Sequence, residues 1–284
     1  MEHRHSQGLS LGWGRGKGIF LPILLVATLA WGKKPPPPSQ AELDAITARG
    51  KLLAEYDVAA WHATDAVLAS VPRDSLKGTG AHYIACKTDA GWVVVWGRLN
   101  EQRDKLLIVY EAKQAATPVQ FSVTKYDPPA VDTGYSLGAT NALNTALQDF
   151  KGEQGYSYNA AVLPAPDAQF YVYVYPGSSE DGVYLLGGDV RYLISKDGLK
   201  VVERRQLHKS ILRFDFSKPD GRKMEMGFHT HVLSDIPEDT DVFYVLARRP
   251  SVPEWVASKN YIYAIEPDGT IKCLGETDKV LHSK

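Results

Sequence analysis

The stretch that decides the fold class is HYIACKTDAGWVVVW, residues 82–96. β-Branched and aromatic residues dominate its two ends, and Asp89-Ala90-Gly91 between them is a turn signal. A connection this short joins antiparallel strands. Two more runs of the same kind, residues 105–110 and 120–125, follow after polar loops. The segment therefore predicts an antiparallel β-meander.

A long helix is predicted before the meander, over residues 41–71. Apolar side chains recur there at helical spacing, and Pro72 ends the pattern. The residues that form this face are Leu43, Ile46, Leu53, Tyr56, Ala60, Ala63, Val67 and Val71. We expect the helix to pack on the meander, so that residues 41–130 form one region.

A second region, residues 131–284, is predicted to mix helices and strands. Pro128-Pro129 indicates a break, and we place the boundary between it and Gly134. The expected elements are a helix at 137–150, hairpins at 156–175 and 190–204, a strand at 224–231, a helix from about 237 to 247 and a final hairpin at 261–274. The predicted class is α+β, with antiparallel or mixed sheets and flanking helices.

The N-terminus is typical of an export signal. Residues 1–17 are polar and carry basic side chains, residues 19–29 are almost all apolar, and Ala30-Trp31-Gly32 offers small residues for cleavage. Residues 33–40 follow as a Pro-rich linker that favours an extended conformation. We expect a secreted or periplasmic protein that meets the membrane only through this signal. An uncleaved N-terminal anchor is the alternative.

Composition narrows the function classes. The 284-residue chain has a formal net charge of −1, which provides no basic surface for nucleic acid. Its two cysteines, Cys86 and Cys273, are too few for a disulfide framework. One bridge between them and two buried free thiols remain open alternatives.

One segment proposes a chemistry: GFHTHVLSDIPEDTD, residues 227–241. Alternate residues of a strand share a face, so His229 and His231 project together. Pro237 is expected early in the following helix, which places Asp241 in its first turns. Two imidazoles and a carboxylate are a ligand set of open catalytic zinc sites. The alternative needs no metal: a hydrogen-bonded histidine pair under a loop, with acidic residues at a helix N-terminus capped by Ser234 or Asp235.

The pattern H-x-H followed by a helix with aspartate resembles the JAMM metalloproteases, zinc isopeptidases of the MPN fold. The resemblance covers roughly the C-terminal half and implies zinc ligands at His229, His231 and Asp241. It also implies a general base at Glu153, after the helix at 137–150, although a solvated turn glutamate explains that residue equally simply. Val232 stands where the family has proline, and Glu238 where it has the serine that helps hold the oxyanion.

Glu203 is a second candidate for the general base. His208 lies in a small basic cluster that could hold an anion, although such a cluster is more typical of a solvated strand end. The whole chain also resembles uncharacterised exported bacterial proteins, a resemblance that names no activity. The sequence thus predicts either a JAMM-like, zinc-dependent peptide or isopeptide hydrolase, in an active or a degenerate form, or a non-enzymatic exported module that binds an unknown peptide or protein.

Overall fold

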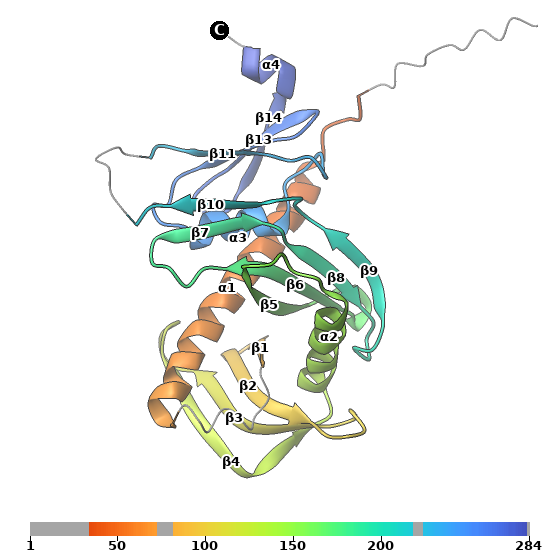
Figure 1. Ribbon diagram of the computed structural model, residues 1–284, viewed down its shortest axis with the longest axis vertical. Coiled ribbons are helices and arrows are strands. Elements are labelled where there is room, and N and C mark those ends of the chain that lie inside the picture. The colour runs from red at the N-terminus through yellow and green to blue at the C-terminus, as the bar shows by residue number, and fades with distance from the viewer. Residues whose placement is uncertain (1–33, 73–81, 218–223, 283–284) are drawn as a thin grey trace, which may run out of the picture. The chain divides into compact units, whose positions relative to one another are not determined.

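The computed structural model describes residues 34–72, 82–217 and 224–282, so the predicted signal lies outside it. Residues 35–284 belong to one compact unit, which mixes helices with antiparallel and mixed sheets (Figure 1). This confirms the predicted α+β class. The helices are α1 Gln40–Ser70, α2 Tyr135–Asp149, α3 Asp239–Ala247 and α4 Thr277–His282, with a 3₁₀ turn, η2, at Pro166–Ala168.

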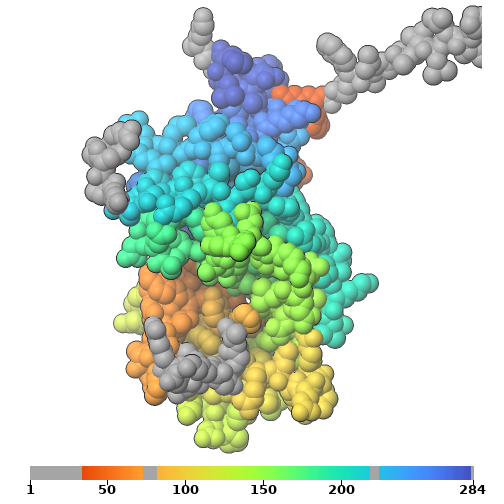
Figure 2. Space-filling view, in the orientation of Figure 1, coloured from red at the N-terminus to blue at the C-terminus, as the bar shows by residue number. Residues whose placement is uncertain are grey.

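Helix α1 is the long helix that the periodicity predicted. Ser39 caps it and forms a capping box with Glu42, in which each side chain accepts from the other residue's backbone N–H. The apolar face is buried along the whole helix, from Leu43 to Val67. Later elements cover it, so α1 is visible only in part on the face drawn in Figure 2.

The predicted meander is present as a four-stranded antiparallel sheet, here called the meander sheet. Its strands are β1 Tyr83–Thr88, β2 Gly91–Leu99, β3 Leu106–Gln114 and β4 Phe121–Asp132. Pro128 and Pro129 do not break the chain as expected, because both lie inside β4. β4 is an edge strand whose pairing with β3 shifts register, and both conditions tolerate residues that lack an N–H.

The second sheet contains the hairpins predicted for residues 156–204. Its order is β5-β6-β8-β9, all antiparallel. The strands are β5 Ser157–Pro164, β6 Phe170–Gly177, β8 Val190–Ile194 and β9 Val201–Gln206. A separate two-stranded ribbon, not predicted from the sequence, pairs β7 Val183–Gly187 with β10 Ile211–Asp215. This ribbon brings the chain after β9 close to the turn that precedes β8.

The C-terminal sheet has the order β11-β12-β13-β14, and its first pair is parallel. Its strands are β11 Gly227–Thr230, β12 Glu254–Ala257, β13 Tyr261–Ile265 and β14 Ile271–Glu276. The sequence pattern did not predict β12. Because β11 and β12 are parallel, the chain must cross over between them, and α3 forms that crossover.

Three apolar clusters hold these layers together. The first joins α1, the meander sheet and the second sheet, and it contains Trp92 and Trp96. The second packs α2 between the same two sheets, and the third packs the start of α1 on α3 and the C-terminal sheet. Cys86 and Cys273 are both free thiols.

Candidate metal site

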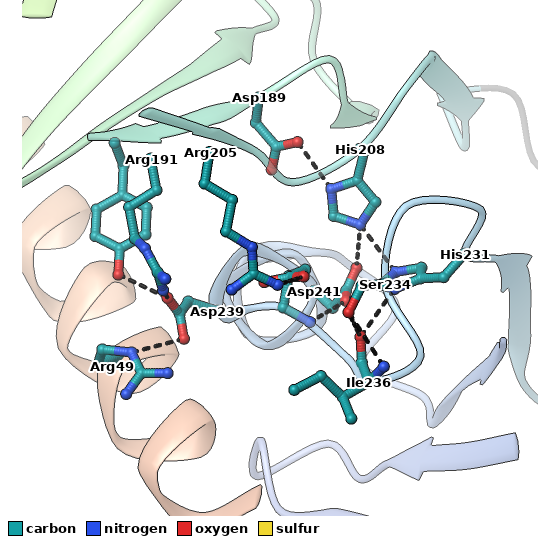
Figure 3. Close-up of polar contacts among 12 residues, drawn as sticks. Arg49, Asp189, Arg191, Arg205, His208, His231, Ser234, Ile236, Asp239 and Asp241 are labelled. Carbon is teal, nitrogen blue, oxygen red and sulfur yellow. Dashed lines mark hydrogen bonds and ion pairs between the residues drawn. The ribbon is translucent and has the colours of Figure 1, made fainter. Parts of the chain in front are cut away.

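Four buried side chains converge between the second sheet and the C-terminal sheet. His208 follows β9, His229 lies in β11, His231 follows it, and Asp241 lies in the first turn of α3. One ligand atom from each lies within 4.8 Å of the others. None of the four residues is more than 8% exposed. Figure 3 shows His208 and His231 pointing toward Asp241.

The three imidazoles meet through the same ring atom, Nε2. The Nε2 of His231 is 2.9 Å from that of His208 and 3.3 Å from that of His229. Asp241 Oδ1 lies 2.9 Å from His208 Nε2 and 3.1 Å from His229 Nε2. Asp241 Oδ2 lies 3.1 Å from His231 Nε2. The carboxylate therefore contacts all three rings.

The other ring nitrogen of each histidine has a partner that can only accept. Nδ1 of His208 lies 2.8 Å from Asp189 Oδ1 and that of His229 lies 2.9 Å from Glu254 Oε1. Nδ1 of His231 lies 3.1 Å from the carbonyl oxygen of Ile236. Each Nδ1 must therefore donate its hydrogen, which leaves the Nε2 lone pairs facing one another.

Four of the six ligand-atom separations are close to those around a tetrahedral cation. A tetrahedron with arms of roughly 2.0–2.1 Å, the usual zinc–nitrogen distance, has edges of about 3.3–3.4 Å. The closest separations in the cluster, 2.9 to 3.3 Å, are near that value or slightly shorter. Four acceptors facing one another repel unless a positive charge lies between them, and a cation or added protons would supply it.

The pKa shifts in the cluster also indicate that positive charge is favoured there. Burial by itself would lower the pKa of His229, but Asp241 and Glu254 outweigh it and raise that pKa to about 9. The pKa of His208 is raised well above its ordinary value against the same burial effect, by Asp189 and Asp241. Burial would raise the pKa of Asp241, yet the surrounding imidazoles hold it well below its ordinary value. The surroundings therefore favour positive charge at this point.

The first turn of α3 presents two more acids. Glu238 contacts Arg205, and Asp239 accepts hydrogen bonds from Arg49 Nε at 2.9 Å and Arg191 Nη1 at 2.6 Å. Tyr173 donates its hydroxyl to Asp239 at 2.7 Å. Burial raises the pKa of Glu238 to about 7. These contacts fix the helix end from which Asp241 reaches the histidines (Figure 3).

The cap of α3 differs from the expectation. Glu238 is the N-cap, in place of Ser234 or Asp235, and the helix starts at Asp239, after Pro237. Asp241 is the third residue of the helix and accepts the backbone N–H of Glu238 through Oδ2 at 2.7 Å. This capping bond turns the Asp241 side chain back toward the helix start. The residues that cap α3 therefore also position the Asp241 carboxylate.

The structure brings together His229, His231 and Asp241, the three residues that the sequence proposed. Glu153 is not in the cluster: it is exposed between α2 and β5, where its backbone N–H donates to Tyr158 Oη at 2.9 Å. Glu203 is also exposed, on β9. His208 is buried in the site and is not part of a solvated strand end, so that expectation was wrong. Its place after β9, beside Asp189, left no local signal in the sequence.

Fold and site together define an α+β protein with a buried cluster of three imidazoles and one carboxylate that could hold a metal ion. Comparisons with family models, curated proteins and solved structures found no match. Within the described residues, no helix is both long and apolar enough to cross a membrane. The function is therefore inferred from the chemistry of the site.

Proposed function

We propose that the protein is an exported, non-enzymatic module whose fold is stabilised by one Zn²⁺ ion at His208, His229, His231 and Asp241. The observation that carries the proposal is that three Nε2 lone pairs and one carboxylate converge on one point. The Nδ1 atom of each histidine and Oδ2 of Asp241 already have hydrogen-bond partners elsewhere. Imidazole and carboxylate ligands at tetrahedral spacing suit zinc. Export rests on the signal-like residues 1–32.

A structural role is favoured because the site is closed. A hydrolytic zinc site keeps one coordination position for water, whereas structural sites fill all four with side chains. His208 would supply a fourth protein ligand in place of that water, and all four side chains are buried. The exposed position of Glu153 also gives no support to a general base at this site. These features favour the non-enzymatic alternative over a JAMM-like hydrolase.

The position of the ligands suggests what the ion would do. His208 belongs to the chain after the second sheet, whereas His229 and His231 belong to the C-terminal sheet and its following loop. Asp241 adds α3. A single ion bonded to all four would tie three separate elements together.

Metal analysis of the purified protein and of His208→Ala tests the proposal. We expect about one zinc per parent chain by mass spectrometry, and loss of most of it in the variant, because a closed site needs its fourth ligand. His282→Ala, at an exposed position in α4, is the matched control and should keep its metal. Full zinc in His208→Ala would favour an open, hydrolase-like site instead, and absence of metal from the parent would overturn the metal proposal.

A further inference from the structure

The chain passes from β7 to β8 through Gly187-Gly188-Asp189. None of these three residues is one of the four proposed metal ligands. Both glycines have positive φ, +88° and +64°. A Cβ on Gly187 would lie 2.2 Å from the carbonyl oxygen of Ser210, and one on Gly188 would lie 2.3 Å from Ile211 Cγ1. Only glycine fits this close approach to the start of β10. The turn thereby places Asp189 directly beside His208.

Asp189 is fixed to the segment that holds His208 by two contacts. Its carbonyl oxygen accepts the backbone N–H of Leu207 at 3.0 Å, and its Oδ1 accepts from His208 Nδ1 at 2.8 Å. Its Oδ2 is buried and has no hydrogen-bond partner. The residue is 1% exposed. A buried carboxylate with one unused oxygen is costly unless a positive charge lies nearby.

Asp189 differs from the other acids around the site in having no arginine partner among the described residues. Glu254 contacts Arg248 as well as His229, and Glu238 contacts Arg205. Asp239 contacts two arginines. Among the described residues, Asp189 has no ion pair with lysine or arginine, and His208 is its single ionisable partner. Asp189 and Asp241 are thus the two carboxylates that arginine does not neutralise.

We infer that Asp189 is a positioning residue that aims His208 and supplies the second negative charge needed to balance a divalent cation. The inference rests on the proposed zinc site. The hydrogen bond from Nδ1 fixes the ring orientation and tautomer of His208 and makes its Nε2 a stronger ligand. The charges of Asp189 and Asp241 together match the two positive charges of the ion, inside a region where screening by water is weak.

The test compares Asp189→Asn with Asp57→Asn, each of which removes one carboxylate charge. Asparagine keeps an oxygen that can accept from His208 Nδ1, so the first variant isolates the charge. Asp57 is the control because it is a half-buried carboxylate that accepts a hydrogen bond from Tyr175 at 3.1 Å and lies outside the cluster. Zinc affinity is measured by competition with a chromophoric chelator. We expect Asp189→Asn to bind zinc about 10–100-fold more weakly and Asp57→Asn to match the parent.

A Co²⁺ spectrum separates a weakened site from a disrupted one. Asp189→Asn should keep the intense visible bands of four-coordinate Co²⁺, because its ligands are intact. Parent-like zinc affinity in Asp189→Asn would overturn the inference while leaving the proposed site standing. A parent that binds no zinc would instead remove the proposed function itself.

A measurement on the unchanged protein covers the case in which Asp189→Asn does not fold. In ¹⁵N-labelled, zinc-loaded parent, the Nδ1–H signals of His208 and His229 should lie downfield of that of His231, because carboxylates accept more strongly than the Ile236 carbonyl. A His208 signal that is absent or exchanges rapidly with water would contradict the inference.

Discussion

At the scale of single residues, the partner of each polar atom decides what that residue can do. His208, His229 and His231 are chemically identical, and a carbonyl or carboxylate on Nδ1 turns the lone pair of each toward Asp241. Buried polar groups rarely lack partners, so a group of acceptors without donors is a place where a cation could bind.

Asp57 provides a prediction about pH. Burial raises the pKa of this carboxyl above its ordinary 3.8, and the hydrogen bond from Tyr175 only partly opposes the shift. A carboxyl with a raised folded-state pKa favours folding below about pH 4, and that contribution is lost as pH rises through the folded pKa. Asp57→Asn removes the charge and keeps an acceptor for Tyr175. We expect a higher melting temperature than the parent at pH 7 and equal melting temperatures near pH 3.

Thermal melts of parent and Asp57→Asn, followed by circular dichroism from pH 3 to pH 8, provide the measurement. Asp65→Asn, at an exposed position of the same helix, is the control and should leave the pH profile unchanged. A variant less stable than the parent at pH 7 would show that the hydrogen bond outweighs the burial of charge.

At the scale of elements, α1 and α3 cross at Gly50, the point that fixes the helix bearing Asp241. A Cβ on Gly50 would lie 2.4 Å from Val242 Cβ and 2.6 Å from the carbonyl oxygen of Asp239. Alanine normally stabilises a helix by about 1 kcal/mol over glycine. Here overpacking reverses the sign, and we expect Gly50→Ala to destabilise the protein by about 1–3 kcal/mol.

Urea unfolding measures the effect of Gly50→Ala, with Asp65→Ala as the control. Asp65 is exposed on α1, so its replacement should be neutral or slightly stabilising. If Gly50→Ala were as stable as the parent, the two helices would have room to separate, and their close crossing would not fix the start of α3. Weaker zinc binding in Gly50→Ala is the accompanying expectation.

The elements that local patterns define could be predicted, and those that depend on distant pairing could not. Periodicity located α1, turn signals located the meander, and strand alternation placed His229 and His231 on one face. The ribbon of β7 and β10 and the parallel strand β12 pair across long separations. His208, Asp189 and Glu254 reach the site through those pairings, so their roles left no local pattern. Burial, the property that marks them, exists only once the sheets have met.

At the scale of the whole molecule, the proposed zinc site lies where the segment after β9, the C-terminal sheet and α3 meet. The cluster that holds α1 to the meander sheet contains none of the four ligands, and neither does the cluster of α3 and the C-terminal sheet. Removing the ion should therefore loosen the region around the ligands first. The meander sheet has its own packing and should remain folded.

Chelation tests this directly. At free zinc 1,000-fold above the dissociation constant, binding stabilises the folded protein by about 4 kcal/mol, and each kcal/mol shifts the melting temperature of a protein this size by about 2–4 °C. We expect a chelator to lower the melting temperature of the parent by about 8–16 °C and to leave metal-free His208→Ala unchanged. Hydrogen exchange should locate the effect, with faster exchange in residues 206–215 and 227–247 and unchanged rates in β2 and β3. Equal acceleration everywhere would mean that the ion supports the unit as one cooperative body, and no acceleration in either range would remove the stabilising role of the metal.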